Sequence, residues 1–123
     1  MLYKNNMSIE AQNDLIFKAL SSSTRRALLD ELKDEPKTTG ELCAIFATLD
    51  RCTVMQHLGV LEAADLVIAS RKGRTRWNHL NPLPIKHIHD RWIGPFAARA
   101  VDRLDRLKTD LERTPKSSAD RVE

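Results

Sequence analysis

Apolar residues recur along the chain in short blocks that have the spacing of amphipathic helices. The N-terminal stretch, residues 1–13, shows no sustained period and is expected to be flexible. The run 15–20 predicts a short first helix, and the apolar positions within 28–32 share one face of a second helix. Pro36 ends the second helix, because a proline ring cannot donate to the helical hydrogen-bond ladder.

A closely connected pair of helices follows. Thr38 or Thr39 is suited to cap the first of them, with Glu41 in the position that a capping box requires. Asp50 is suited to cap the second, because its carboxylate can accept a hydrogen bond from a free backbone N–H of the first turn. Only a short turn separates the two predicted helices, which is typical of a helix-turn-helix.

The helix that begins after Asp50 has two chemically different faces. Val54, Leu58 and Leu61 are spaced at i, i+4 and i+7, so they share an apolar face that we expect to be buried. The opposite face carries small or polar residues, namely Cys52, Gln56 and Gly59, with Arg51 and Met55 at its flank. This pattern is typical of a helix that packs on a core and presents its other side to a partner.

The period then changes to that of strands. Residues 66–71 and 75–80 are rich in β-branched and aromatic side chains, and Lys72 and Gly73 between them predict a tight turn. The whole hairpin, residues 66–80, contains four cationic residues and no carboxylate. Such a patch attracts a polyanion, although a solvated hairpin without a partner would show the same composition.

The longest helical pattern follows residues 81–84, where two prolines break the chain. Gly94 and Pro95 interrupt this pattern, so a kink or a break is expected there. The polar tail, residues 114–123, is expected to be disordered, which leaves 14–113 as the predicted domain. The apolar positions of the last helix are Ile85, Ile88, Trp92, Phe96, Ala100, Leu104, Leu107 and Leu111.

The chain has 123 residues and a formal net charge of +3, which fits one small domain. No apolar run approaches the ~18 residues that a membrane span needs, and two cysteines are too few for a disulfide framework. A cytoplasmic protein with reduced thiols is therefore expected. The order helix, helix, helix-turn-helix, hairpin, helix predicts a mainly α fold with a small β-hairpin, the winged helix-turn-helix.

Several short motifs are distributed over most of the chain, namely Phe17-Lys18-Ala19-Leu20, Thr24-Arg25-Arg26, Gly40-Glu41-Leu42, Val54-Met55-Gln56-His57-Leu58-Gly59-Val60-Leu61, Leu66-Val67, Gly73-Arg74 and Leu80-Asn81-Pro82. Together these motifs resemble the ArsR/SmtB family of bacterial winged-helix repressors. The resemblance runs from residue 17 to residue 111. It implies a homodimeric DNA-binding transcriptional regulator whose terminal helices form the dimer interface.

The resemblance also implies which side chains meet DNA and which meet a second subunit. The residues expected on the base-reading helix are Arg51, Cys52, Thr53, Met55, Gln56 and His57. The cationic hairpin, or wing, would lie against phosphates or the minor groove with Arg71, Lys72, Arg74 and Arg76. The expected dimer interface consists of Leu15, Phe17, Ile88, Trp92, Phe96, Leu104, Leu107 and Leu111. Trp92 and Phe96, four residues apart, could instead line an effector pocket.

The chain departs from the family pattern in three places. The turn over residues 47–50 is longer than the commonest form. Met55 replaces a small polar residue, so an apolar contact, such as one with a thymine methyl group, is expected there. Cys43 is followed two residues later by Ile45, so the Cys-x-Cys pair of the metal-sensing members is incomplete.

The cysteines and histidines form no metal-binding motif, and no metal or cofactor is expected. A transition-metal site needs three or four converging ligands, whereas His87 and His89 point apart on a helix. Cys43 is expected to be a small core residue. Cys52, near a helix N-terminus, is either an inert surface thiol or a redox-sensitive one. No phosphate-binding glycine loop or nucleophile elbow is present, so an enzyme is not expected.

The sequence therefore predicts a sequence-specific, dimeric transcriptional regulator, and a repressor that binds an inverted repeat in double-stranded DNA is favoured. Gln56 and Arg51 are expected to hydrogen-bond base edges, because both can pair bidentately with purines. Two alternatives stay open: a winged-helix module for protein–protein contact, and the same repressor switched by a thiol or a metal. The effector and the operator do not follow from the sequence.

Overall fold

The computed structural model describes the backbone of residues 2–3 and 7–122 and the side chains of residues 7–94 and 99–113. The chain forms two compact units, Met1–Lys86 and His87–Glu123, and each is described by itself. The domain expected over 14–113 is thus divided between two units. The reason is that every side chain described between residues 99 and 113 is exposed and lies outside the core.

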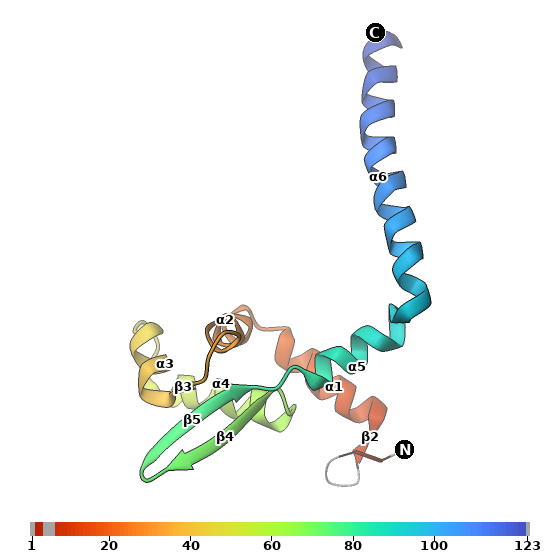
Figure 1. The fold of residues 1–123 in the computed structure, drawn as a ribbon. Coiled ribbons are helices and arrows are strands. Elements are labelled where there is room, and N and C mark those ends of the chain that lie inside the picture. Colours follow the sequence, from red (N-terminus) through yellow and green to blue (C-terminus); the bar gives the residue numbers. More distant parts are fainter. Residues whose placement is uncertain (1, 4–6, 123) are drawn as a thin grey trace. The chain divides into compact units, whose positions relative to one another are not determined.

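The first unit holds the helices and strands of the winged helix-turn-helix (Figure 1). Its helices are α1 (Ile9–Leu20), α2 (Ser23–Leu32), α3 (Thr39–Ile45) and α4 (Arg51–Ala63). Its strands are β1 (Leu2–Tyr3), β2 (Met7–Ser8), β3 (Lys37–Thr38), β4 (Val67–Lys72) and β5 (Thr75–Leu80). The mainly α composition with a small sheet confirms the predicted fold class.

Helix α1 is longer than predicted and begins at Ile9 instead of residue 15. Ser8 caps it, since its side chain accepts a hydrogen bond from the backbone N–H of Ala11 at 3.1 Å. Gln12 is buried, and its Nε2 donates to the carbonyl of Ala64 at 3.1 Å. The apolar period missed this first part of α1 because a polar residue, Gln12, occupies a core position there. The expected flexibility of residues 1–13 is therefore wrong for 9–13, which are helical.

The core of the first unit is built largely from leucines of different helices. Leu28, Leu42, Leu58 and Leu61 are each at most 1% exposed. The predicted inner face of α4 is confirmed, because Val54 is also completely buried beside Leu58 and Leu61. Burying such a side chain contributes about 1.5–3 kcal/mol, so these contacts hold α4 against α1, α2 and α3 and turn its other face outward.

A Schellman motif ends α4 and directs the chain into the wing. Asp65 adopts a left-handed backbone conformation with φ 63°, and the N–H of Leu66 donates to the carbonyl of Leu61 at 2.9 Å. The side chain of Asn81, which follows β5, donates to the carbonyl of Asp65 at 2.9 Å. The two ends of the hairpin are thereby joined to the end of α4.

The wing belongs to a three-stranded antiparallel sheet with the order β3-β5-β4. Strands β4 and β5 pair from Val67 opposite Leu80 to Lys72 opposite Thr75. The loop between them has two residues, of which Gly73 has φ 63°, as short hairpin loops require. In Figure 1 the tip of this hairpin extends beyond the helices of the first unit. The short strand β3 was not predicted.

Helix α5 (Leu83–Trp92) contains the boundary between the units, and α6 (Gly94–Val122) follows it. The predicted break is confirmed at Gly94, which has φ 51°. The backbone of α6 is helical over residues 114–122, where a disordered tail was expected.

Candidate nucleic-acid interface

Helix α4 is capped as the sequence predicted. The Oδ1 atom of Asp50 accepts a hydrogen bond from the backbone N–H of Thr53 at 2.7 Å, and this bond lowers the pKa of the Asp50 carboxyl group below its usual value. At the start of α3, Thr38 and Glu41 form the expected capping box, with hydrogen bonds of 2.9 and 3.1 Å. Both helices of the helix-turn-helix therefore begin at defined residues.

The face of α4 that points away from the core carries the small and polar residues that the sequence predicted there. Arg51, Cys52, Gln56 and Gly59 are exposed. The other predicted base-reading residues, Thr53, Met55 and His57, are half-buried at the edges of this face. The most accessible side chains for a ligand that approaches α4 are thus an arginine, a thiol and a carboxamide, and of these the arginine and the carboxamide can donate hydrogen bonds to base edges.

His57 is attached to the interior of the first unit through Arg25 of α2. The Nη1 atom of Arg25 lies 3.3 Å from Nδ1 of His57, and the same guanidinium donates to the carbonyls of Ala19 at 2.8 Å and Lys18 at 3.0 Å. The structure thus places His57 at the edge of α4, half-buried and in contact with Arg25. Direct contact between His57 and DNA stays a prediction.

The four cationic residues of the wing fall into two groups. Arg71, Lys72 and Arg74 are exposed at the outer end of the hairpin. Arg76 is different, because its side chain is only 17% exposed and its Nη2 lies 3.1 Å from Oε2 of Glu62 on α4. Arg76 therefore differs from the other three cationic residues in having a carboxylate partner, and contact of the four residues with phosphates or the minor groove stays a prediction.

A cleft of ≈ 340 Å³ lies between the wing, α4 and the beginning of α3. It brings together two predicted sets of residues that are about 20 positions apart in the sequence. Arg51 and Met55 line it from α4, and the wing contributes Arg71, Arg74 and Arg76. Arginine is well suited to phosphate, because its planar guanidinium can donate two parallel hydrogen bonds. The cleft therefore has the charge and the donors for a nucleic-acid backbone.

The same cleft includes residues that the sequence did not assign to the interface. Thr38, Thr39 and Gly40 line its wall, and Thr75 of β5 also contributes. The capping box at Thr38 and Glu41 marked where α3 begins, but only the pairing of β3 with β5 shows that this point lies beside the wing. Gly40 has no side chain and the threonine side chains are short, so these residues fill little of the cleft.

The cysteines and histidines are spread over the structure. Cys43 is half-buried, so it is less buried than the core residue that was expected, and Cys52 is exposed. Within the described residues, no three His, Cys, Asp or Glu side chains lie close enough to hold a metal ion. Among the same residues, no helix is both long and apolar enough to cross a membrane.

The side chains expected at a dimer interface are largely uncovered in a single chain. Leu15 and Ile88 are half-buried, and Phe17 is 45% exposed. Along α6 the apolar residues follow one another at intervals of three or four positions and remain exposed, namely Val101, Leu104, Leu107 and Leu111. Trp92 is also exposed, whereas the side chain of Phe96 lies outside the described residues. Subunit assembly stays a prediction.

The two caps predict how the stability of the first unit depends on pH. The pKa of Glu41 is lowered chiefly by the backbone N–H of Thr38, as that of Asp50 is lowered by Thr53. Both carboxylates therefore stabilise the folded state at neutral pH, and this contribution is lost as the pH falls below about 5. Urea denaturation between pH 7 and pH 3 measures it. In the variant Glu41→Gln/Asp50→Asn, which keeps acceptors at both caps, we expect a smaller loss of stability over the same range. An unchanged pH dependence would contradict this account.

An apolar-backed helix with an exposed polar front, joined to a cationic hairpin, defines the winged helix-turn-helix class of DNA-binding proteins. A model of helix-turn-helix domains matches residues 20–68. The chain is 40% identical over 91 residues to the HTH-type transcriptional regulator YuzN of Bacillus subtilis, which covers 69% of this chain and 99% of YuzN. It is also 35% identical over 66 residues to the transcriptional repressor SdpR of the same species, over 54% of this chain and 72% of SdpR.

Among solved structures, an ArsR-like transcriptional regulator from Rhodococcus sp. RHA1 superimposes with a TM-score of 0.60 and 25% identity, over 81% of this chain and 92% of that chain. The chain therefore belongs to the ArsR-type helix-turn-helix transcriptional regulators. It is a DNA-binding transcriptional regulator, as its sequence predicted.

Proposed function

We propose that this regulator is a homodimeric repressor that binds an inverted repeat in double-stranded DNA and acts by binding, without catalysis. The observation that carries the proposal is the cleft that Arg51 of α4 lines together with Arg71 and Arg74 of the wing. With α4 in the major groove, the sugar-phosphate backbone beside that groove would lie along the wing side of this cleft, and the α4 side would face the bases. Such a complex forms in the cytoplasm.

The exposed residues of α4 and of the wing are assigned different roles in this complex. Gln56 and Arg51 are exposed and can each pair bidentately with a purine, so we assign them to base recognition. Met55 is half-buried in the cleft wall, where it can reach a thymine methyl group. The exposed wing residues Arg71 and Arg74, together with Lys72, supply phosphate contacts.

The exposed apolar face of α6 supports the dimer. Leu104, Leu107 and Leu111 repeat at intervals of three and four residues, which is the spacing of a helix that packs along a second helix. An exposed apolar row of this kind marks an interaction surface. Two subunits would then place their α4 helices in successive major grooves, about 34–36 Å apart.

We favour repression over activation. A dimer bound to an operator at a promoter excludes RNA polymerase because it occupies the same DNA. This mode of regulation requires no additional interaction surface on the dimer. SdpR, which is similar to this chain, bears the name transcriptional repressor. A strong decrease of duplex affinity with salt would also separate this proposal from a protein–protein interaction module, which has no phosphates to neutralise.

The wing and α4 are expected to respond differently to mutation. Arg74→Ala should weaken binding to all duplexes and reduce the slope of log affinity against log salt by about one unit per protomer, because one phosphate contact is lost. Gln56→Ala should leave that slope nearly unchanged and relax selectivity at one base pair, at a cost of about 1–3 kcal/mol on the preferred site. Fluorescence anisotropy with a selected duplex and a scrambled duplex measures both. Equal losses of both variants on both duplexes would refute these roles.

A further inference from the structure

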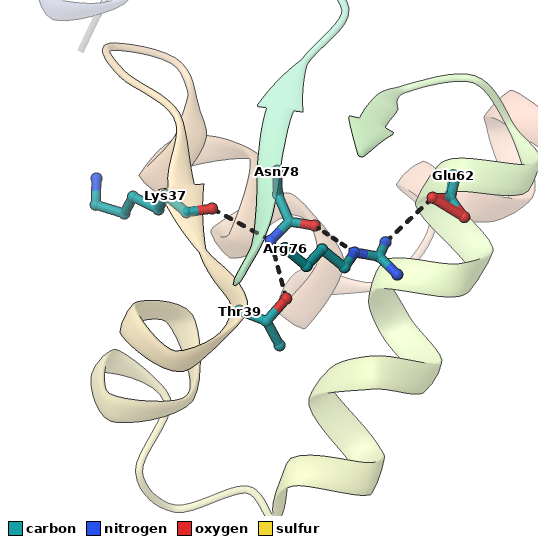
Figure 2. A network of polar contacts seen from close by, with 5 residues as sticks. All are labelled: Lys37, Thr39, Glu62, Arg76 and Asn78. Carbon is teal, nitrogen blue, oxygen red and sulfur yellow. Dashed lines mark hydrogen bonds and ion pairs between the residues drawn. The ribbon is translucent and has the colours of Figure 1, made fainter. Parts of the chain in front are cut away.

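A buried carboxamide lies where the wing, β3 and α3 meet (Figure 2). Asn78 of β5 is completely buried, and its Nδ2 donates to the carbonyl of Lys37 at 3.2 Å and to Oγ1 of Thr39 at 3.1 Å. Its Oδ1 accepts a hydrogen bond from Nε of Arg76 at 3.1 Å. A buried amide with partners on both ends holds its surroundings in one arrangement, because each lost bond would leave an unsatisfied polar atom.

Arg76 continues this chain of contacts from the wing to α4. While Nε donates to Asn78, Nη2 donates to Oε2 of Glu62 at 3.1 Å, so one planar guanidinium joins strand β5 to the last part of α4 (Figure 2). The side chain of Arg76 is 17% exposed and that of Glu62 is 43% exposed. Partial burial on the arginine side shields the pair from solvent and makes its geometry more defined than that of a surface ion pair.

Arg76 differs from the other wing arginines because it has a carboxylate partner, Glu62. Arg71 and Arg74 are exposed and, within the described residues, have no carboxylate in ion-pair range, whereas the charge of Arg76 is matched by Glu62. We propose that Arg76 and Glu62 are positioning residues. Together with Asn78 they set the angle between the wing and α4, so that both elements reach one DNA duplex at once. This proposal rests on the proposed function, since it concerns how the same interface is held.

The direction in which one substitution changes the DNA affinity distinguishes a positioning role from direct contact with DNA. Glu62→Gln removes a negative charge beside a DNA-binding surface, so electrostatics alone predicts unchanged or tighter binding. If Glu62 holds Arg76 in place, the same substitution weakens binding, because a neutral carboxamide replaces the charge-assisted hydrogen bond to the guanidinium with a weaker neutral one. A role in fold stability alone predicts no change of affinity at a temperature where the variant is fully folded.

The experiment uses the whole 123-residue chain and a duplex that the wild type selects from a random-sequence pool. Affinity is measured at a temperature where thermal denaturation shows every variant to be folded. We expect about tenfold weaker binding for Glu62→Gln and for Arg76→Lys, which keeps its charge but cannot bond both partners. The double variant Glu62→Gln/Arg76→Lys should bind about as weakly as either single variant, since both break the same connection. Asp30→Asn, which removes an exposed carboxylate on α2, is the matched control and should bind like the wild type.

Two outcomes would overturn the inference. Tighter or unchanged binding by folded Glu62→Gln would show that the ion pair does not position the wing. Wild-type affinity for Arg76→Lys would show that only the charge of Arg76 matters, as in a simple phosphate contact. Failure of the wild type to select any duplex would instead refute the proposed function, and the two failures are therefore distinguishable.

Discussion

Leu107→Asp is expected to abolish tight binding to an inverted-repeat duplex. Leu107 lies in the middle of the exposed apolar row on α6 and is 52% exposed in a single chain. A carboxylate in a packed helix–helix contact would be desolvated without a partner, so the dimer should dissociate. Each subunit then binds one half-site alone and loses the gain from linked binding, which we expect to weaken affinity about 100-fold or more.

The control for this prediction is Thr109→Asp. Thr109 is exposed on the same helix, and two positions of helix rotate it away from Leu107, so the variant adds the same charge outside the row. Sedimentation equilibrium should find monomers for Leu107→Asp and dimers for the control. A dimeric Leu107→Asp variant with wild-type affinity would show that subunits do not meet along this face of α6.

Leu58→Ala is expected to have the largest effect on stability. Leu58 is completely buried on the inner face of α4, and truncating such a leucine costs about 2–5 kcal/mol, because the cavity collapses only partly. That is a large share of the ~5–15 kcal/mol by which a typical domain is stable. Urea denaturation followed by circular dichroism should show a strongly lowered midpoint, and DNA binding should be lost as the folded fraction falls.

The neighbouring residue, Gly59, provides a control substitution that is expected to raise the stability. Gly59 is exposed, and a methyl group added to it would meet no atom within 4 Å. Gly59→Ala is therefore expected to stabilise the protein by about 0.5–1 kcal/mol through the helix propensity of alanine. If Leu58→Ala were as stable as the wild type, α4 would not depend on its buried face, and its outward orientation would need another cause.

The parts of the fold that were predictable are those that a local pattern determines. The two faces of α4 follow from a 3.6-residue period with Asp50 before it, and the wing follows from two β-rich runs around Gly73. Each of these signals lies within about one element, so no knowledge of distant contacts is needed. The start of α1 was missed because buried Gln12 interrupts the apolar period there.

The candidate site was only partly predictable for a related reason. The charge of the wing is visible in the sequence, but the partner of Arg76 is Glu62, which is 14 positions away and on a different element. Sequence patterns therefore could not distinguish a paired arginine from the exposed Arg74. Similarly, the contribution of Thr38 and Gly40 to the cleft depends on the pairing of β3 with β5, which brings together residues about 40 positions apart.

The separation of the two faces of α4 has a consequence for how such regulators diversify. The buried leucines and Val54 hold the helix in place, while Arg51, Cys52, Gln56 and Gly59 make no contribution to that inner packing. Their identities can change without disturbing the scaffold. A library that randomises these four outward positions should hence yield folded proteins with new target preferences, and gene duplication followed by drift at the same positions offers a route to insulated regulatory circuits within one genome.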